Sequence, residues 1–188
     1  DIDQWSIESP EYQRLAKSWG GVINRSVLIS YGTQISSTER DIWRDAAVYI
    51  KCQAVLWAAD GIASRKTKII TLLNGMRAVT SFQWDSVEQY RLVAGWACTN
   101  LCQAAAIIGY RDLAFDQFLR NVCYPILEWT GGGNWHASFA DSRLAIAAYL
   151  GDKPLWDDAR RYYNERIAQS IYHPTYDMGY VKPLHNED

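Results

Sequence analysis

The chain has 188 residues, of which 48% are hydrophobic, so it is long enough to bury a core as one domain. Its 19 lysines and arginines nearly balance its 21 aspartates and glutamates, and without a basic run there is no electrostatic footprint for a nucleic-acid partner. The longest apolar stretch, Val93–Tyr110, is interrupted by Asn100 and Gln103, so we expect no membrane span.

The spacing of apolar residues predicts an all-α protein. Residues 1–40 are expected to be irregular apart from one short helix at Pro10–Trp19. Beyond them, apolar residues recur at intervals of three and four, and strand-like alternation is rare. Six further helices are expected, at Asp41–Ala59, Thr67–Thr80, Ser86–Ile108, Leu113–Cys123, Trp135–Leu150 and Pro154–Ala168. We expect residues 1–188 to form a single helical domain.

Three passages look like one repeated unit. In each, a small-residue helix ends at a glycine and a short turn leads into a more amphipathic helix. The glycines are Gly61, Gly109 and Gly151, spaced 48 and 42 residues apart (109 − 61 and 151 − 109), which is a period for paired helices. Stacked helical hairpins form either an open superhelix, typical of protein-binding scaffolds, or a closed (α/α) toroid with a cleft at one end.

The aromatic composition favours the toroid. Nine Trp and twelve Tyr stand against four Phe. Trp and Tyr combine an apolar face with a polar tip, so they suit the walls of a wet groove in which sugar rings stack, although they also serve as core residues.

The segment Gly131–His136, with the sequence Gly-Gly-Gly-Asn-Trp-His, opens one of the predicted helices. Its glycines permit unusual backbone conformations, Asn134 can serve as the N-cap, and the free amide hydrogens of the first turn favour an anion. Such a corner can hold a sugar carboxylate beside Trp135. The alternative is an ordinary capped helix after a loose loop.

Residues distributed along the chain carry a resemblance to a known family. They are Trp43, Leu92–Ala97, Asn100, Leu101, Ala104–Ile108, Gly133–Trp135, Ser138, Asp141, Ala145–Ala147 and Leu155–Ala159. In this order they resemble the alginate-lyase-type superfamily of α/α-toroid polysaccharide lyases. The resemblance implies β-elimination on a uronic-acid-containing polysaccharide, alginate or glucuronan-like, and we expect no cofactor.

The resemblance also implies site residues. In such lyases the Asn of the Gly-Asn-Trp motif contacts the uronate carboxylate, a His or Tyr removes the C5 proton, and a Tyr protonates the leaving oxygen. Asn134 is carried over directly, with Trp135 as its neighbour or platform, but the base is not. His136 is one candidate, because an imidazole has a suitable pKa. His185 is another, since some toroid lyases place a catalytic His at a similar distance after the Asn; its alternative is a solvated tail.

Further candidates for substrate binding are Trp96, Asn100, Tyr176, Tyr180 and Arg143. Trp96 and Asn100, one helical turn apart, would present a stacking face with an amide, or else pack in the core. The two tyrosines line the cleft or pack a loop. Arg143 reaches a polyanion or, as the favoured alternative, forms a surface ion pair with Asp141 or Asp152.

The four cysteines do not indicate a metal site. Cys98 and Cys102 lack the spacing of a zinc knuckle, and no histidine pair complements them. If the protein is secreted, we expect Cys98 or Cys102 to bridge to Cys52 or Cys123 across neighbouring helices.

Secretion and an additional polypeptide are further expectations. The chain begins at Asp1 without an initiator Met, and Asn24-Arg25-Ser26 is a glycosylation sequon, so we expect an extracellular protein. Related lyases continue into more helical hairpins, and the resemblance therefore implies that this chain is the first half of a longer toroid, either as a fragment of a cleaved protein or as a half completed by a second polypeptide. An α/α-toroid glycoside hydrolase is the other enzymatic alternative, but its two carboxylic acids are not paired by spacing; Asp141 and Asp177 are available.

Overall fold

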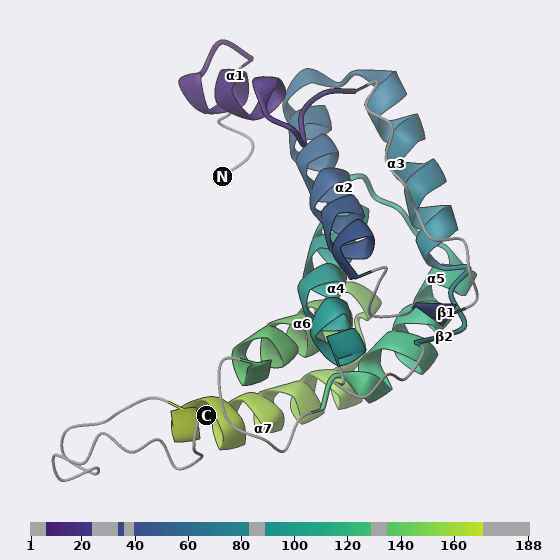
Figure 1. Cartoon of the computed structure of the whole chain (residues 1–188), viewed down its shortest axis with the longest axis vertical. Coiled ribbons are helices and arrows are strands. Elements are labelled where there is room, and N and C mark those ends of the chain that lie inside the picture. Colours follow the sequence, from purple (N-terminus) through teal and green to yellow (C-terminus); the bar gives the residue numbers. More distant parts are fainter. Residues whose placement is uncertain (1–6, 24–33, 36–39, 83–88, 129–134, 171–188) are drawn as a thin grey trace, which may run out of the picture.

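The computed structural model describes residues 7–23, 34–35, 40–82, 89–128 and 135–170. Within these ranges it is built almost wholly of helices, which confirms the all-α prediction (Figure 1). The α-helices are α1 (Pro10–Lys17), α2 (Arg40–Asp60), α3 (Ala63–Met76), α4 (Gln89–Ile107), α5 (Leu113–Phe118), α6 (Trp135–Leu150) and α7 (Lys153–Ser170). None of these described helices is long and apolar enough to cross a membrane.

Glycines end the first helix of each of three hairpins, α2/α3, α4/α5 and α6/α7, as the repeat predicts. Gly61, Gly109 and Gly151 have φ values of 66°, 65° and 63°. Beyond α4 and α6 the chain closes a Schellman motif, in which Tyr110 N–H donates to the Ala105 carbonyl at 2.8 Å and Asp152 N–H to the Ala147 carbonyl at 3.1 Å. The same stop signal therefore sets all three hairpin turns.

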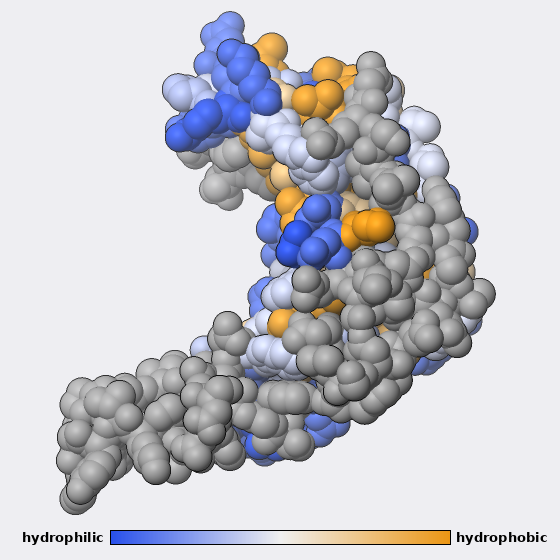
Figure 2. Space-filling view, viewed as in Figure 1, coloured by the Kyte–Doolittle hydropathy of each residue, from blue (hydrophilic) through white to orange (hydrophobic). Residues whose placement is uncertain are grey.

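The hairpins follow one another along an arc. In Figure 1, α2, α4 and α6 lie toward its hollow side, and Figure 2 shows the curved outline in space-filling form. Helices α4 and α6 run parallel, because Gly95 faces Ser138 near their starts and the Tyr149 hydroxyl donates to the Tyr110 carbonyl beyond the end of α4 at 2.7 Å. We call α2, α4 and α6 the inner helices.

Close approach of two inner helices depends on Gly95. A Cβ at this position would lie 2.8 Å from Ser138 Oγ and 2.9 Å from a ring carbon of Phe139. Ser142 adds a hydrogen bond from its hydroxyl to the Gly95 carbonyl. The missing side chain thus lets the backbones of α4 and α6 pack directly against each other.

The core lies between these helices. Its largest fully buried side chains come from every hairpin: Trp43, Tyr49, Phe115, Phe139, Ile50, Leu56, Ile69, Leu73, Met76, Leu101 and Leu119. Trp43 meets Phe82 and Phe118 edge-on, with ring centroids 5.4 and 6.1 Å apart. One continuous apolar cluster therefore joins the inner helices to the segments outside them.

A buried polar cluster attaches the N-terminal segment. Arg65 on α3 is 6% exposed, forms an ion pair with Asp60 at 2.8 Å, and donates to Gln53 at 2.7 Å and to the Gly21 carbonyl at 2.9 Å. Tyr12 of α1 donates to the same Asp60 carboxylate at 2.9 Å. The short N-terminal helix is present, as predicted, and this cluster holds it against α2 and α3.

Three local predictions need correction. Helix α3 begins at Ala63 rather than Thr67, because the Ile62 N–H is satisfied by the Asp60 side chain and the helix can start directly after the glycine turn. The helix expected over 113–123 changes after Phe118 into a π turn (Leu119–Cys123) and a 3₁₀ turn (Tyr124–Ile126), since Pro125 donates no backbone hydrogen bond. A parallel bridge of two residues, β1 (Gln34–Ile35) with β2 (Ser81–Phe82), was not expected.

The expected interhelical disulfide is also absent from the structure. All four cysteines are free thiols, with Cys98, Cys102 and Cys123 buried. Cys98 and Cys123 share a hydrogen bond, and burial together with this contact raises the pKa of the Cys123 thiol well above its ordinary value. These side chains therefore act as small buried apolar groups.

Candidate functional site

A groove of about 480 Å³ runs over the inner helices. Its described lining side chains share a three- and four-residue spacing on each helix. They are Arg44, Val48 and Lys51 on α2, Trp96, Thr99, Asn100 and Gln103 on α4, and Ser138 and Asp141 on α6, with the Gly95 backbone beneath. Each helix therefore contributes one stripe to the groove.

The stripe on α4 is held in place by bonds to its neighbour. Thr99 Oγ1 donates to Asp141 at 2.8 Å and lies 3.0 Å from Ser142 Oγ. Asn100 Nδ2 donates to the Trp96 carbonyl one turn back at 2.8 Å. These contacts fix the floor of the groove while leaving the Trp96 ring partly exposed to solvent.

The structure brings together two of the residues predicted to bind substrate. Trp96 and Asn100 both line the groove, one turn apart, as their spacing implied. Their surroundings add two cations that sequence reasoning missed. Arg44 lies 6.0 Å from the centre of the Trp96 ring, and Lys51 lies along the same face of α2.

The two cations differ in their partners. Arg44 forms ion pairs with Asp41 at 3.2 Å and Asp45 at 2.9 Å. No carboxylate of the described residues pairs with Lys51, whose side chain is half-buried in the groove wall. Lys51 is therefore the groove cation most open to an added anion.

The residues of the Gly-Asn-Trp-His segment divide between described and undescribed parts of the chain. Asn134 lies outside the described residues, as do His185, Tyr176 and Tyr180. Trp135 begins α6, is half-buried, and meets Phe139 edge-on at 6.2 Å. It is not among the side chains that line the groove, so the structure gives it a packing contact.

His136 is enclosed rather than exposed to the groove. Its side chain is 1% exposed, and Nδ1 lies 3.1 Å from the Tyr162 hydroxyl of α7. A general base must reach the proton that it removes. In this position His136 links α6 to α7, which argues against its use as the base.

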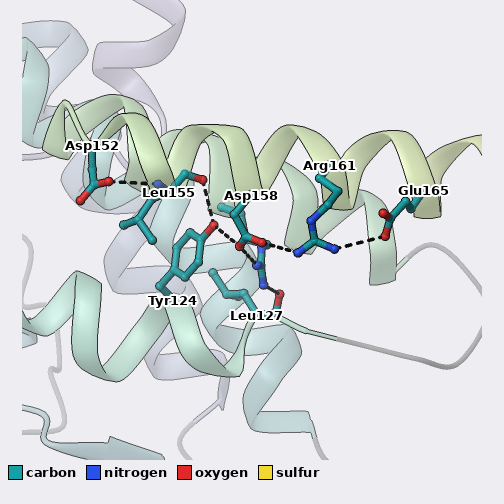
Figure 3. A network of polar contacts seen from close by, with 8 residues as sticks. Tyr124, Leu127, Asp152, Leu155, Asp158, Arg161 and Glu165 are labelled. Carbon is teal, nitrogen blue, oxygen red and sulfur yellow. Dashed lines mark hydrogen bonds and ion pairs between the residues drawn. The ribbon is translucent and has the colours of Figure 1, made fainter.

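Arg143 corrects another expectation. It is 6% exposed and does not pair with Asp141 or Asp152, because its ion pair is with Asp158 on α7, which Figure 3 shows beside Tyr124 and Arg161. Nη1 donates to the Leu127 carbonyl at 2.8 Å, and the guanidinium lies 4.4 Å from the centre of the Tyr124 ring. All these contacts are internal, so Arg143 is part of the hairpin interface.

The Asp158 carboxylate is the centre of this network. It accepts hydrogen bonds from Tyr124 at 2.9 Å and from Arg161 at 2.5 Å in addition to the Arg143 pair. Partial burial alone would raise the pKa of Asp158, but the hydrogen bonds from Tyr124 and Arg161 and the charge of Arg143 lower it overall. Burial and the bond to Asp158 raise the pKa of Tyr124 to about 12. The network therefore keeps Asp158 ionised and Tyr124 protonated.

No group of three or more His, Cys, Asp or Glu side chains within the described ranges is arranged to hold a metal ion. No protein-family model matches the chain, and neither does any curated protein or solved structure. The groove is therefore the feature of this molecule from which a function can be inferred.

Proposed function

We propose that this chain is the groove-forming part of an extracellular polysaccharide lyase that cleaves a uronic-acid-containing polysaccharide, alginate or glucuronan-like, by β-elimination. Its three hairpins would form part of an (α/α) toroid, with further hairpins in the same or in a second polypeptide. The observation that supports this most is the groove in which a half-exposed Trp96, the Asn100 amide and the Lys51 cation meet.

This combination suits an acidic sugar. A pyranose ring stacks on an indole face, the Lys51 ammonium attracts the uronate carboxylate, and Asn100 and Gln103 supply amide groups for the hydroxyls. In the proposed complex Trp96 is the platform and Lys51 selects uronate over neutral sugar.

The proposed reaction requires the uronate carboxylate to be held while charge develops on it. A base removes the C5 proton, the C4–O bond breaks, and the electron pair of the C–H bond becomes the C4=C5 double bond. The leaving oxygen takes a proton. We assign carboxylate stabilisation to Asn134, whose neutral amide donates to the developing enediolate-like charge. With His136 enclosed, His185 or a residue outside this sequence supplies the base.

The hydrolase alternative receives less support. Hydrolysis by the usual mechanism needs two carboxylic acids on either side of the scissile bond. Asp141 is the one carboxylate among the described groove-lining residues, and it already accepts a hydrogen bond from Thr99.

The test is an assay of the complete protein, with any partner polypeptide, on polymannuronate, polyguluronate and polyglucuronate. A lyase produces conjugated double bonds that absorb in the ultraviolet, whereas a hydrolase produces reducing ends alone. Asn134→Ala is expected to lower kcat/KM by about 10² or more. Asn164→Ala on the exposed face of α7 is the matched control and should retain activity. Reducing ends without ultraviolet absorbance would favour the hydrolase, and no activity on any uronate polymer would favour a protein-binding scaffold.

A further inference from the structure

The groove does not end at Asp141. A second hollow of about 410 Å³ shares Gln103 and Asp141 with the first, so the two adjoin along α4 and α6, and we call them together the channel. The α4 side chains that line it run from Trp96 to Ala106, a rise of about 15 Å along the helix. The channel is therefore long enough for more than one sugar ring.

The far end of the channel repeats the chemistry of the near end. Trp156, in the first turn of α7, is 36% exposed and lines the second hollow together with Arg111. The Arg111 guanidinium lies 4.5 Å from the centre of the Tyr149 ring and donates to the Tyr149 carbonyl, which fixes its position. Both ends thus combine an accessible indole with a cation.

Between the two ends the channel is lined by small and polar side chains, and the exposed Gln103 and Asp141 lie where the two hollows adjoin. Ala106, Ala145 and Ala148 contribute side chains of a single carbon, and Leu144 provides a larger apolar contact. Small side chains allow the flat face of a sugar ring to approach the helices closely. No carboxylate of the described residues pairs with Arg111, which leaves its exposed side chain available to an anion.

We propose that Trp156 and Arg111 form a second, distal subsite for the acidic polysaccharide, in which Trp156 stacks on a ring and Arg111 binds the carboxylate of a uronate several residues along the chain from the one at Lys51. This proposal rests on the proposed function. It implies that the protein holds an internal stretch of its polymer, with affinity that increases with oligosaccharide length.

The experiment measures dissociation constants of size-graded uronate oligosaccharides by calorimetry. Trp156→Ala and Arg111→Gln are each expected to weaken binding of hexa- and octasaccharides by about tenfold, with disaccharide binding unchanged, since loss of one stacking or charge contact is of that order. The matched controls are Tyr163→Ala and Arg160→Gln, exposed positions of α7 outside the channel. Lys51→Met should weaken binding of long and short oligosaccharides alike.

The outcomes separate this subsite from the proposed function. If Trp156→Ala and Arg111→Gln bind every oligosaccharide as tightly as the wild type does, the distal subsite is overturned. It is also overturned if both variants lose affinity equally at every oligosaccharide length. The lyase proposal stands in either case. Neutral gluco-oligosaccharides that bind as tightly as uronates of equal length overturn the role of Arg111. No binding of any uronate oligosaccharide overturns both proposals. Tight binding of an amphipathic helical peptide in the same channel would identify it as a protein-docking surface.

Discussion

Two regions of this molecule combine cations with aromatic rings, and they differ in what the cation already contacts. In the hairpin interface Arg143 is buried against Tyr124 and Tyr162 and is neutralised by Asp158. In the groove Lys51 lies near Trp96 without an ion-pair partner among the described residues. The residue types are alike, so only burial and pairing separate a structural cluster from a candidate binding surface.

The largest expected effect is on stability, at the buried cluster. Arg143→Met leaves the buried Leu127 carbonyl without its donor and removes one of three donors to Asp158, so we expect the free energy of unfolding to fall by about 3 kcal/mol. Urea denaturation monitored by circular dichroism measures this. Arg161→Met is the matched control, because Arg161 binds the same carboxylate from an exposed position and its loss should lower the free energy of unfolding much less. Equal losses for the two variants would contradict the distinction.

A smaller loss is expected where α4 meets α6. Gly95→Ala places a methyl group against Ser138 and Phe139 at distances that require the helices to separate. We expect a net destabilisation of about 1–3 kcal/mol despite the better helix propensity of alanine, measured by thermal denaturation. Ala106→Gly, on the exposed channel side of the same helix, measures the difference in helix propensity between alanine and glycine without a change in helix packing. An increase in stability for Gly95→Ala would show that the two helices are less tightly packed than described.

Removal of a cation from the groove should lower ligand affinity rather than stability, which is the opposite of its effect in the hairpin interface. Lys51→Met is expected to change the free energy of unfolding by less than about 0.5 kcal/mol, because its removal leaves no buried carboxylate of the described residues unpaired. Its effect should appear instead as about a tenfold loss of affinity for uronate oligosaccharides, stronger at low salt. Lys68→Met, on α3 and outside the groove, is the control. A large loss of stability with unchanged affinity would make Lys51 a structural residue like Arg143.

The smallest effect is a pH dependence of stability to which Tyr124 of the buried cluster contributes. Folding raises the pKa of Tyr124 from 10.0 to about 12, so the protonated phenol is favoured in the native state. Its contribution to stability is complete below pH 10 and is lost as the pH rises toward about 12. Tyr124→Phe should therefore flatten the decline in stability over this interval. The flattening is partial, since the pKa of Tyr149 is also raised to about 12 by burial. Tyr163→Phe should retain the wild-type slope.

The all-α fold and its hairpin boundaries are encoded locally, which is why the sequence predicts them well. Gly61, Gly109 and Gly151 each follow a helix-patterned run, and a glycine in a left-handed conformation stops a helix whatever the rest of the chain does. The β1/β2 bridge depends on two short segments far apart in sequence. A strand of two residues is too short to show the alternation of apolar and polar residues by which strands are predicted. The π turn at Leu119–Cys123 precedes Pro125, which is a local signal that the prediction of a regular helix over 113–123 did not use.

The candidate site was only partly predictable for a related reason. Trp96 and Asn100 are neighbours on one helix, so their shared face follows from spacing alone. Lys51 lines the same groove only because of the way α2 packs against α4, and this packing cannot be deduced from residue spacing. Arg143 was assigned to nearby carboxylates, yet residues two apart on a helix do not face each other, and its partner Asp158 lies on the next helix. The spacing of Arg44, Val48 and Lys51 places them on one face of α2, and this pattern could have indicated the two cations that the sequence analysis missed.

The parallel packing of α4 and α6 has an electrostatic consequence. Peptide dipoles sum along each helix, so the partial positive charges of their N-terminal ends gather at one end of the groove and the partial negative charges at the other. Side-by-side dipoles of the same direction repel, and the returning helix of each hairpin, running the opposite way, offsets part of that repulsion. A chain with a net charge of only −2 therefore carries a directional field along its groove, and a bound polyanion would be attracted more strongly toward the N-terminal ends of α4 and α6 than toward their C-terminal ends.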